Sequence, residues 1–133
     1  MAGAQPGVRP GRGRDVSFVI VEDDPAVADA LQALLVGAGH DATVRSSAES
    51  LFSSAPPRGG DTVIVDLGLP GIGGAVLVAW LSALADPPRI IVISGKSSLT
   101  IERETRHLRP VQVLRKPPSA DWLEAMTTAS PPH

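Results

Sequence analysis

The sequence contains no cysteine, and only 3% of its 133 residues are aromatic. Without cysteine, neither a disulfide nor a thiolate metal site can form. So few aromatic side chains give little support to a surface on which single-stranded nucleic acid could stack. No apolar run approaches the roughly 20 residues that cross a membrane, and no apolar segment directly follows the N-terminal arginines, as it would in a secretory signal. We therefore expect a cytoplasmic protein that has no membrane partner and does not bind nucleic acid directly.

The length and composition are those of a single globular domain. A chain of 133 residues lies in the one-domain range, and a 43% share of hydrophobic residues is enough for an ordinary core. The formal net charge of −2 neither favours nor excludes a particular partner. Residues 1–14 are rich in Gly, Pro, Ala and Arg without periodicity, which predicts a flexible tail. The domain is then expected over residues 15–129, followed by a short C-terminal tail over 130–133.

Between these tails, apolar strand patterns alternate with helical patterns. The strand patterns are typical of a parallel sheet buried on both faces and lie at Val16–Val21, Ala42–Arg45, Thr62–Asp66, Arg89–Ile93 and Val111–Leu114. Helices are expected from Pro25 to the glycines at 37 and 39, over Ala48–Phe52, over Gly74–Ala85, from Ser97 or Ser98 to about His107, and over Ser119–Thr128. This alternation predicts an α/β fold, a doubly wound five-stranded parallel sheet with right-handed crossovers.

Acidic, hydroxyl and basic residues stand at the ends of four of these strands. The acids Glu22–Asp24 follow the first strand, Asp66 ends the third, Ser94 follows the fourth and Lys116 closely follows the fifth. An ionised carboxylate is costly to bury, so Asp66 at the tip of an apolar strand indicates a cleft. Ligands of doubly wound sheets bind outside the carboxyl ends of the strands, where the strand order reverses. The sequence therefore predicts one site that gathers these side chains.

The residue types at this site favour metal-assisted phosphoryl transfer. Three carboxylates from Glu22, Asp23 and Asp66 would repel one another unless a cation joined them. A few hard oxygen ligands with open positions suit Mg²⁺, which keeps several waters. Lys116 could balance further negative charge, and Ser94 could donate to an incoming oxyanion. Such a set suits phosphoryl transfer to a carboxylate, because positioning and charge neutralisation stabilise its transition state.

In their order and spacing, these residues resemble the receiver domain of two-component response regulators. The resemblance covers about residues 16–129 and is carried by four motifs: Val19 to Pro25 (VIVEDDP), Val63 to Gly71 (VIVDLGLPG), Ile93-Ser94-Gly95 and Arg115-Lys116-Pro117. It implies the flavodoxin-like (βα)5 receiver fold. It also implies Mg²⁺ as cofactor, and a sensor histidine kinase or a phosphotransfer protein as partner.

The resemblance assigns metal-binding roles to four residues. Asp23 would bind Mg²⁺ directly, together with Asp66, and Gly68 would offer its backbone carbonyl. Glu22 would contribute through water or a more indirect contact. Because three acids follow one another, the register is ambiguous. We choose Glu22 and Asp23 because they directly follow the apolar strand, whereas Asp24, next to Pro25, is interpreted as a helix cap.

The resemblance assigns the remaining roles to residues around the phosphoryl group. Asp66 would accept that group from a phosphohistidine. Ser94 would bind a phosphoryl oxygen, and Lys116 would pair first with Asp66 and then with the phosphoryl group. The Lys116–Pro117 peptide bond is expected to be cis.

One position departs from the family pattern. Receivers often carry Tyr or Phe three residues before the lysine, where this chain has Val113. The usual aromatic switch is therefore not expected, although the chemistry at Asp66 should be preserved. Lys96, two residues after Ser94, lies where the family tunes the lifetime of the phosphoryl group.

Several hypotheses about output remain open. The chain ends soon after the last predicted helix, so we expect output through an unknown target protein unless the chain is a fragment of a longer regulator. We expect a monomer or weak homodimer that is not an enzyme beyond its own aspartyl phosphorylation and dephosphorylation. The alternatives are a phosphate sink or relay, and a pseudo-receiver that works without phosphorylation. A hydrolase is more distant, because no substrate pocket or general acid is evident.

Overall fold

The computed structural model describes residues 17–108 and 112–127. Within these residues, parallel strands alternate with helices in the order β1 (Ser17–Val21), α1 (Pro25–Gly37), β2 (Asp41–Arg45), α2 (Ala48–Phe52), β3 (Thr62–Asp66), α3 (Gly74–Ser82), β4 (Arg89–Ser94), α4 (Ser98–Thr105), β5 (Gln112–Arg115) and α5 (Ala120–Thr127). The predicted tails over 1–14 and 130–133 lie outside the described residues. So do Val16, Val111 and Thr128, the outermost residues of three predicted elements.

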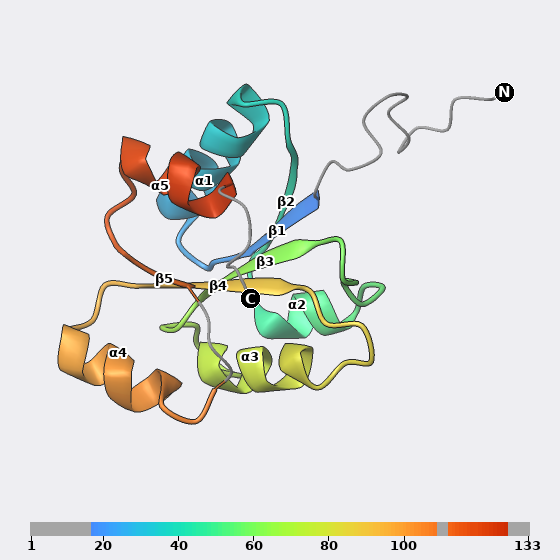
Figure 1. The fold of residues 1–133 in the computed structure, drawn as a ribbon, viewed down its shortest axis with the longest axis vertical. Coiled ribbons are helices and arrows are strands. Elements are labelled where there is room, and N and C mark those ends of the chain that lie inside the picture. The colour runs from blue at the N-terminus through green and yellow to red at the C-terminus, as the bar shows by residue number, and fades with distance from the viewer. Residues whose placement is uncertain (1–16, 109–111, 128–133) are drawn as a thin grey trace, which may run out of the picture.

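The strands form one parallel sheet in the order β2-β1-β3-β4-β5 (Figure 1). The chain moves outward from β1 to β2 and then returns to place β3 on the other side of β1, so the strand order reverses between β1 and β3. Val21 at the end of β1 is in register with Val65, one residue before the end of β3. Glu22 and Asp66 are therefore level at the switch point, as the α/β prediction requires.

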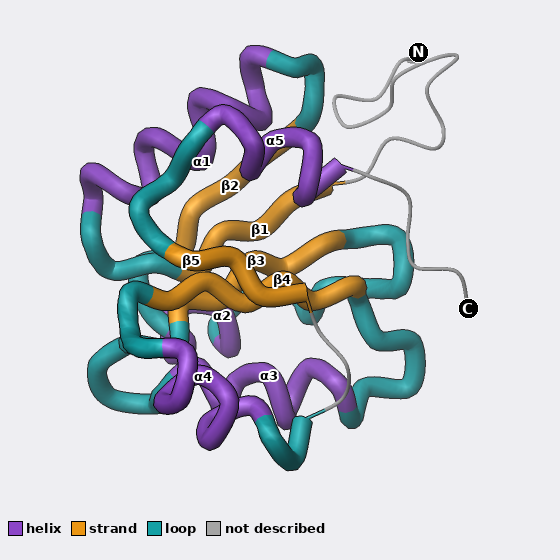
Figure 2. The backbone as a smooth tube through the Cα atoms, turned by 60° about the vertical axis from the view of Figure 1, so that its left-hand side comes forward, coloured by secondary structure: helices purple, strands orange, loops and turns teal. Residues whose placement is uncertain are grey.

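Helices cover both faces of the sheet. Helices α1 and α5 lie on one face, and α2, α3 and α4 lie on the other (Figures 1 and 2). Successive residues of a strand point to opposite faces, so Ile64 packs under α1 and α5 while its neighbours Val63 and Val65 pack under α2 and α3. The inner strands are apolar on both sides for this reason. The predicted doubly wound (βα)5 fold is confirmed.

Helix starts follow the capping residues in the sequence. The side chain of Asp24 accepts a hydrogen bond from the backbone N–H of Ala26 at 2.9 Å, and Pro25 occupies the first turn of α1. Ser47 caps α2 and Ser97 caps α4 in the same manner. The interpretation of Asp24 as a helix cap is thus confirmed.

Some element ends differ from the predicted ones. Helix α3 ends at Ser82 instead of Ala85, because the chain tightens there into a turn in which Leu84 N–H donates to the Leu81 carbonyl at 3.2 Å. Helix α4 ends at Thr105, two residues early, in a turn closed by the bond from Leu108 N–H to the Thr105 carbonyl. Strand β4 runs one residue further than predicted, because Ser94 pairs with Arg115 of β5. None of the helices in the described part of the chain has the length and apolar character needed to cross a membrane.

Candidate functional site

Backbone hydrogen bonds hold the carboxyl ends of the strands level with one another. Glu22 N–H donates to the Arg45 carbonyl at 3.0 Å, Leu67 N–H to the Ile93 carbonyl at 3.0 Å, and Lys116 N–H to the Ser94 carbonyl at 2.9 Å. Each bond carries the ladder just past the end of a strand. Residues far apart in the sequence are therefore fixed at one edge of the sheet.

Three acids meet at this edge. Oxygens of Glu22, Asp23 and Asp66 all lie within 4.8 Å of one another. Glu22 is 2% exposed and Asp66 is 4% exposed, whereas Asp23 is open to solvent. The backbone N–H of Gly68 donates to Asp66 Oδ1 at 2.9 Å, which orients that carboxylate. The structure thus brings together the three acids that were chosen from the sequence.

Lys116 supplies the counter-charge. Its Nζ lies 3.1 Å from Glu22 Oε1 and 3.3 Å from Asp66 Oδ2. The Lys116–Pro117 peptide bond is cis, as the resemblance implied. Burial lowers the pKa of Lys116, but its contacts with Glu22 and Asp66 outweigh that effect and raise the pKa above its ordinary value. Lys116 is therefore a permanent cation at this site.

The pKa of the Glu22 carboxyl is strongly raised. Burial, followed by hydrogen bonding to the Asp66 carboxyl, raises its pKa from 4.5 to about 7, against the lowering effect of the Asp24 N–H and Lys116. Its Oε2 accepts the Asp24 N–H at 3.1 Å. Its Oε1 is buried and receives no hydrogen bond from the described residues, although Lys116 faces it as an ion pair. Glu22 Oε1 can therefore still accept a hydrogen bond or bind a cation.

Ser94 ends β4, one residue after the register partner of Asp66, and is buried at 1% exposure. Its Oγ accepts the backbone N–H of Lys96 at 3.0 Å, which leaves the hydroxyl hydrogen available for donation. The Lys96 side chain instead pairs with Glu104 of α4, with 2.9 Å between Nζ and Oε2. Lys96 therefore links the loop after β4 to α4, a contact that the sequence alone did not indicate.

Residues 18–128 match the response regulator receiver domain family. The chain belongs to this family.

Relatives of this receiver are longer proteins. It is 30% identical to the transcriptional regulatory protein FixJ of Bradyrhizobium diazoefficiens over 107 residues, which cover 80% of this chain and 52% of FixJ. It is 36% identical to the sensory transduction protein RegX3 of Mycolicibacterium smegmatis over 83 residues, which cover 62% of this chain and 36% of RegX3. The receiver thus matches about half of the first relative and about a third of the second.

Solved receiver structures show the same fold. The CheY-like receiver domain protein from Methanospirillum hungatei JF-1 superimposes with a TM-score of 0.73 at 21% identity, over 84% of this chain and 90% of that one. The CheY-like receiver domain from Methylobacillus flagellatus gives a TM-score of 0.68 at 29% identity, over 84% and 94% of the two chains.

The acids of this receiver fit a divalent cation. They provide hard oxygen ligands within reach of one centre, and one of these oxygens, Glu22 Oε1, is buried and receives no hydrogen bond from the described residues. Asp23 is exposed, so part of the coordination sphere can remain water, as Mg²⁺ prefers. Asp24 does not belong to the cluster, because its carboxylate caps α1.

One glycine after β3, Gly74, packs against the backbone of the receiver's central aspartate, and site prediction missed it. A Cβ on Gly74 would collide with the carbonyl oxygen of Asp66 and lie 2.8 Å from Leu67 Cα. Gly71 has φ +70, and a Cβ there would lie 2.9 Å from Glu49 Oε2. Gly68 differs, because a Cβ there would make an ordinary 3.5 Å contact with Asp66 Oδ1. The only sequence signal was the density of glycine before α3.

Proposed function

We propose that this receiver accepts a phosphoryl group on Asp66 in a Mg²⁺-dependent reaction. The donor would be a phosphohistidine of a sensor histidine kinase or phosphotransfer protein in the cytoplasm. The observation that carries the proposal is the setting of Asp66 at the sheet's switch point. Gly68 N–H and Lys116 hold its two oxygens, and two further carboxylates stand beside it.

In the proposed step, an Asp66 oxygen attacks phosphorus and the P–N bond of the phosphohistidine breaks. The electron pair returns to the imidazole, which leaves as the neutral base after taking up a proton. The product is an acyl phosphate on Asp66, and attack by water on its phosphorus later restores the carboxylate and releases phosphate. Glu22, Asp23, Asp66 and the Gly68 carbonyl are the groups proposed to hold Mg²⁺, which when bound neutralises charge on the transferring group.

Lys116 and Ser94 have defined parts in this proposal. Lys116 Nζ lies 3.3 Å from Asp66 Oδ2. Once Asp66 carries the phosphoryl group, the ammonium can pair with a negatively charged oxygen of that group instead. Ser94 can donate its hydroxyl hydrogen to another phosphoryl oxygen. Because every group acts on the chain's own carboxylate, we propose a phosphoryl acceptor and not an enzyme for a separate substrate.

Incubation with acetyl phosphate and Mg²⁺, followed by intact-mass measurement, tests the proposal. The native protein should gain the mass of one phosphoryl group, and the gain should disappear in EDTA. Asp66→Asn should gain none, whereas Asp121→Asn, on the exposed start of α5, should behave as the native protein does. A native protein without an adduct, or an adduct that survives in Asp66→Asn, would overturn the proposal.

Val113 favours a second candidate, a phosphate sink or relay. Its half-buried side chain packs with the core under α3 and α4, where an aromatic switch would need a ring. A sink needs no such switch. NMR spectra with Mg²⁺ and beryllofluoride, a phosphoryl analogue, would separate the candidates. Shifts that reach α4 and α5 support a switch, whereas shifts confined to the strand ends support a sink.

A further inference from the structure

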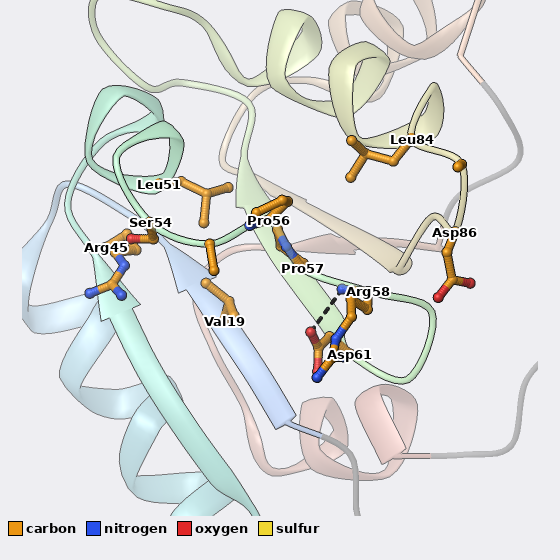
Figure 3. A pocket seen from close by; sticks show the side chains of 12 residues that line it. Val19, Arg45, Leu51, Ser54, Pro56, Pro57, Arg58, Asp61, Leu84 and Asp86 are labelled. Atoms are coloured by element: carbon orange, nitrogen blue, oxygen red, sulfur yellow. Dashed lines mark hydrogen bonds between the residues drawn. The ribbon is translucent and has the colours of Figure 1, made fainter.

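A cavity of about 600 Å³ opens beside α2 (Figure 3). Its walls come from β1, the end of β2, α2, the 53–61 connection and the residues between α3 and β4. Neither the three acids nor Ser94 and Lys116 line it. The cavity is therefore a second concave site, separate from the proposed phosphoryl acceptor.

The cavity exists because α2 is short. The helix has five residues and ends at Phe52, so it covers only part of the sheet face beneath it. Val19, in the middle of the internal strand β1, remains half-buried as a result, whereas Val21 on the same face is fully buried. Leu51, Pro57 and Leu84 add further apolar lining, beside charged side chains that include Arg45 and Asp86. The size lies in the range of small-molecule sites, which span about 300–1,000 Å³.

Arg45 gives this cavity a specific polar end. Alternate residues of β2, Ala42 and Val44, pack toward α1, so Arg45 projects to the α2 side and into the cavity wall. Its Nε is buried and has no hydrogen-bond partner among the described residues, in which no carboxylate forms an ion pair with it either. A buried donor without a partner is destabilising, because it has given up its hydrogen bonds to water without replacing them. A guanidinium binds a carboxylate through two parallel hydrogen bonds, which would satisfy this group.

The acids that line the cavity hold its wall. Asp61 accepts the backbone N–H of Arg58 at 2.9 Å, and Asp86 accepts that of Gly59 at 3.0 Å. Figure 3 shows Asp86 at the far end of the cavity from Arg45, with Arg58 as well as apolar side chains between them. Negative charge on a ligand is therefore favoured at the Arg45 end, whereas Arg58, Asp61 and Asp86 give the other end charges of both signs. A molecule with one anionic end and an apolar body matches this arrangement.

We propose that this cavity binds a small organic monocarboxylate. Its carboxylate pairs with Arg45, and its apolar body lies against Val19, Leu51 and Leu84. This binding goes beyond phosphoryl acceptance and does not require Asp66.

Methyl NMR titrations of the full chain test this with 4-phenylbutyrate and 4-phenylbutanol, which share an apolar body and differ in charge. The methyl signals of Val19, Leu51 and Leu84 should shift and saturate with 4-phenylbutyrate. We expect 4-phenylbutanol to bind about ten-fold more weakly, because it lacks the carboxylate that makes the charge-assisted contact with Arg45. The same shifts should occur in Asp66→Asn, so the result does not depend on the phosphoryl-acceptor proposal.

Variants of Arg45 test whether this residue is the cation that binds the carboxylate. Arg45→Gln should weaken 4-phenylbutyrate binding about ten-fold and leave 4-phenylbutanol unchanged, whereas Arg45→Lys should keep part of the difference. Arg103→Gln, on the exposed side of α4, is the matched control and should bind as the native protein does. Shifts elsewhere, equal binding of the two probes, or no saturable shift would overturn the proposal. If Arg45→Gln does not fold, the two-probe comparison on the native chain decides.

Discussion

Glu22 is the residue on which the state of the acidic site depends most. It is almost fully buried, carries a pKa of about 7 and shares Lys116 with Asp66. One lysine cannot neutralise three carboxylates. Without a divalent cation, the folded protein therefore holds a proton on Glu22 more tightly than the unfolded chain does.

We expect Glu22→Gln to stabilise the protein in EDTA at pH 8, by roughly 1–2 kcal/mol. The folded pKa is raised from 4.5 to about 7, so this acid supports folding below pH 4.5 and loses that contribution as pH rises through 7. The variant's advantage should accordingly vanish near pH 4.5 and be largest above pH 7. Urea unfolding at several pH values measures it.

Two comparisons make this prediction specific. Glu104→Gln, which removes a partly exposed carboxylate paired with Lys96, should change stability by less than about 1 kcal/mol. Added Mg²⁺ should stabilise the native protein more than Glu22→Gln, because the variant lacks one of the acids. An equal or lower stability of Glu22→Gln at pH 8 in EDTA would contradict this account of the burial.

Sequence reasoning was strongest for residues at strand ends. Parallel register brings the carboxyl ends of β1, β3, β4 and β5 together, so Glu22, Asp23, Asp66, Ser94 and Lys116 could be placed at one edge without coordinates. The burial of Glu22 could not be predicted, since it depends on how its side chain turns toward Lys116. The Lys96–Glu104 pair was also missed, because it depends on the direction in which α4 leaves the loop.

At the scale of elements, the contact between α3 and β3 positions Asp66. Helix α3 begins at Gly74, whose Cα faces the backbone of Asp66 and Leu67 with no room for a side chain. Gly73, one residue earlier, has open space around its Cα. A side chain could therefore be accommodated at Gly73 but not at the adjacent Gly74. The pattern of glycines could predict a turn here but not which glycine touches the sheet.

Gly74→Ala should therefore destabilise the protein by about 1–3 kcal/mol, since the backbone atoms that it meets cannot rotate away. Gly73→Ala should cost less than about 1 kcal/mol, mainly from a poorer helix cap. Urea unfolding of the two variants measures the difference. Equal losses in both would show that α3 can shift away from β3, and that the close approach does not fix Asp66.

At the scale of the whole molecule, one sheet supports two cores. The α1–α5 core and the α2–α3–α4 core share every inner strand through alternate residues (Figure 2). Arg89 of β4 adds a polar link, because its guanidinium donates to the Met126 carbonyl of α5 at 2.7 Å and to Gln112 of β5 at 3.0 Å. The alternating pattern could predict two covered faces. It could not predict the cavity beside α2, which depends on the path of the chain after Phe52.

The shared strands imply that both faces unfold as one unit, and the two tryptophans can report on this separately. Trp80 lies on α3 at 38% exposure, with 4.7 Å between the centroids of its ring and that of Phe52, whereas Trp122 is buried in the opposite core on α5.

In Trp122→Phe, fluorescence follows the α3 face; in Trp80→Phe, it follows the α5 face. Within each variant, the urea midpoint by fluorescence should coincide with that by circular dichroism. The comparison is internal to each variant, so a general loss of stability does not disturb it. A fluorescence midpoint below the circular dichroism midpoint in only one variant would show that its face separates from the sheet first.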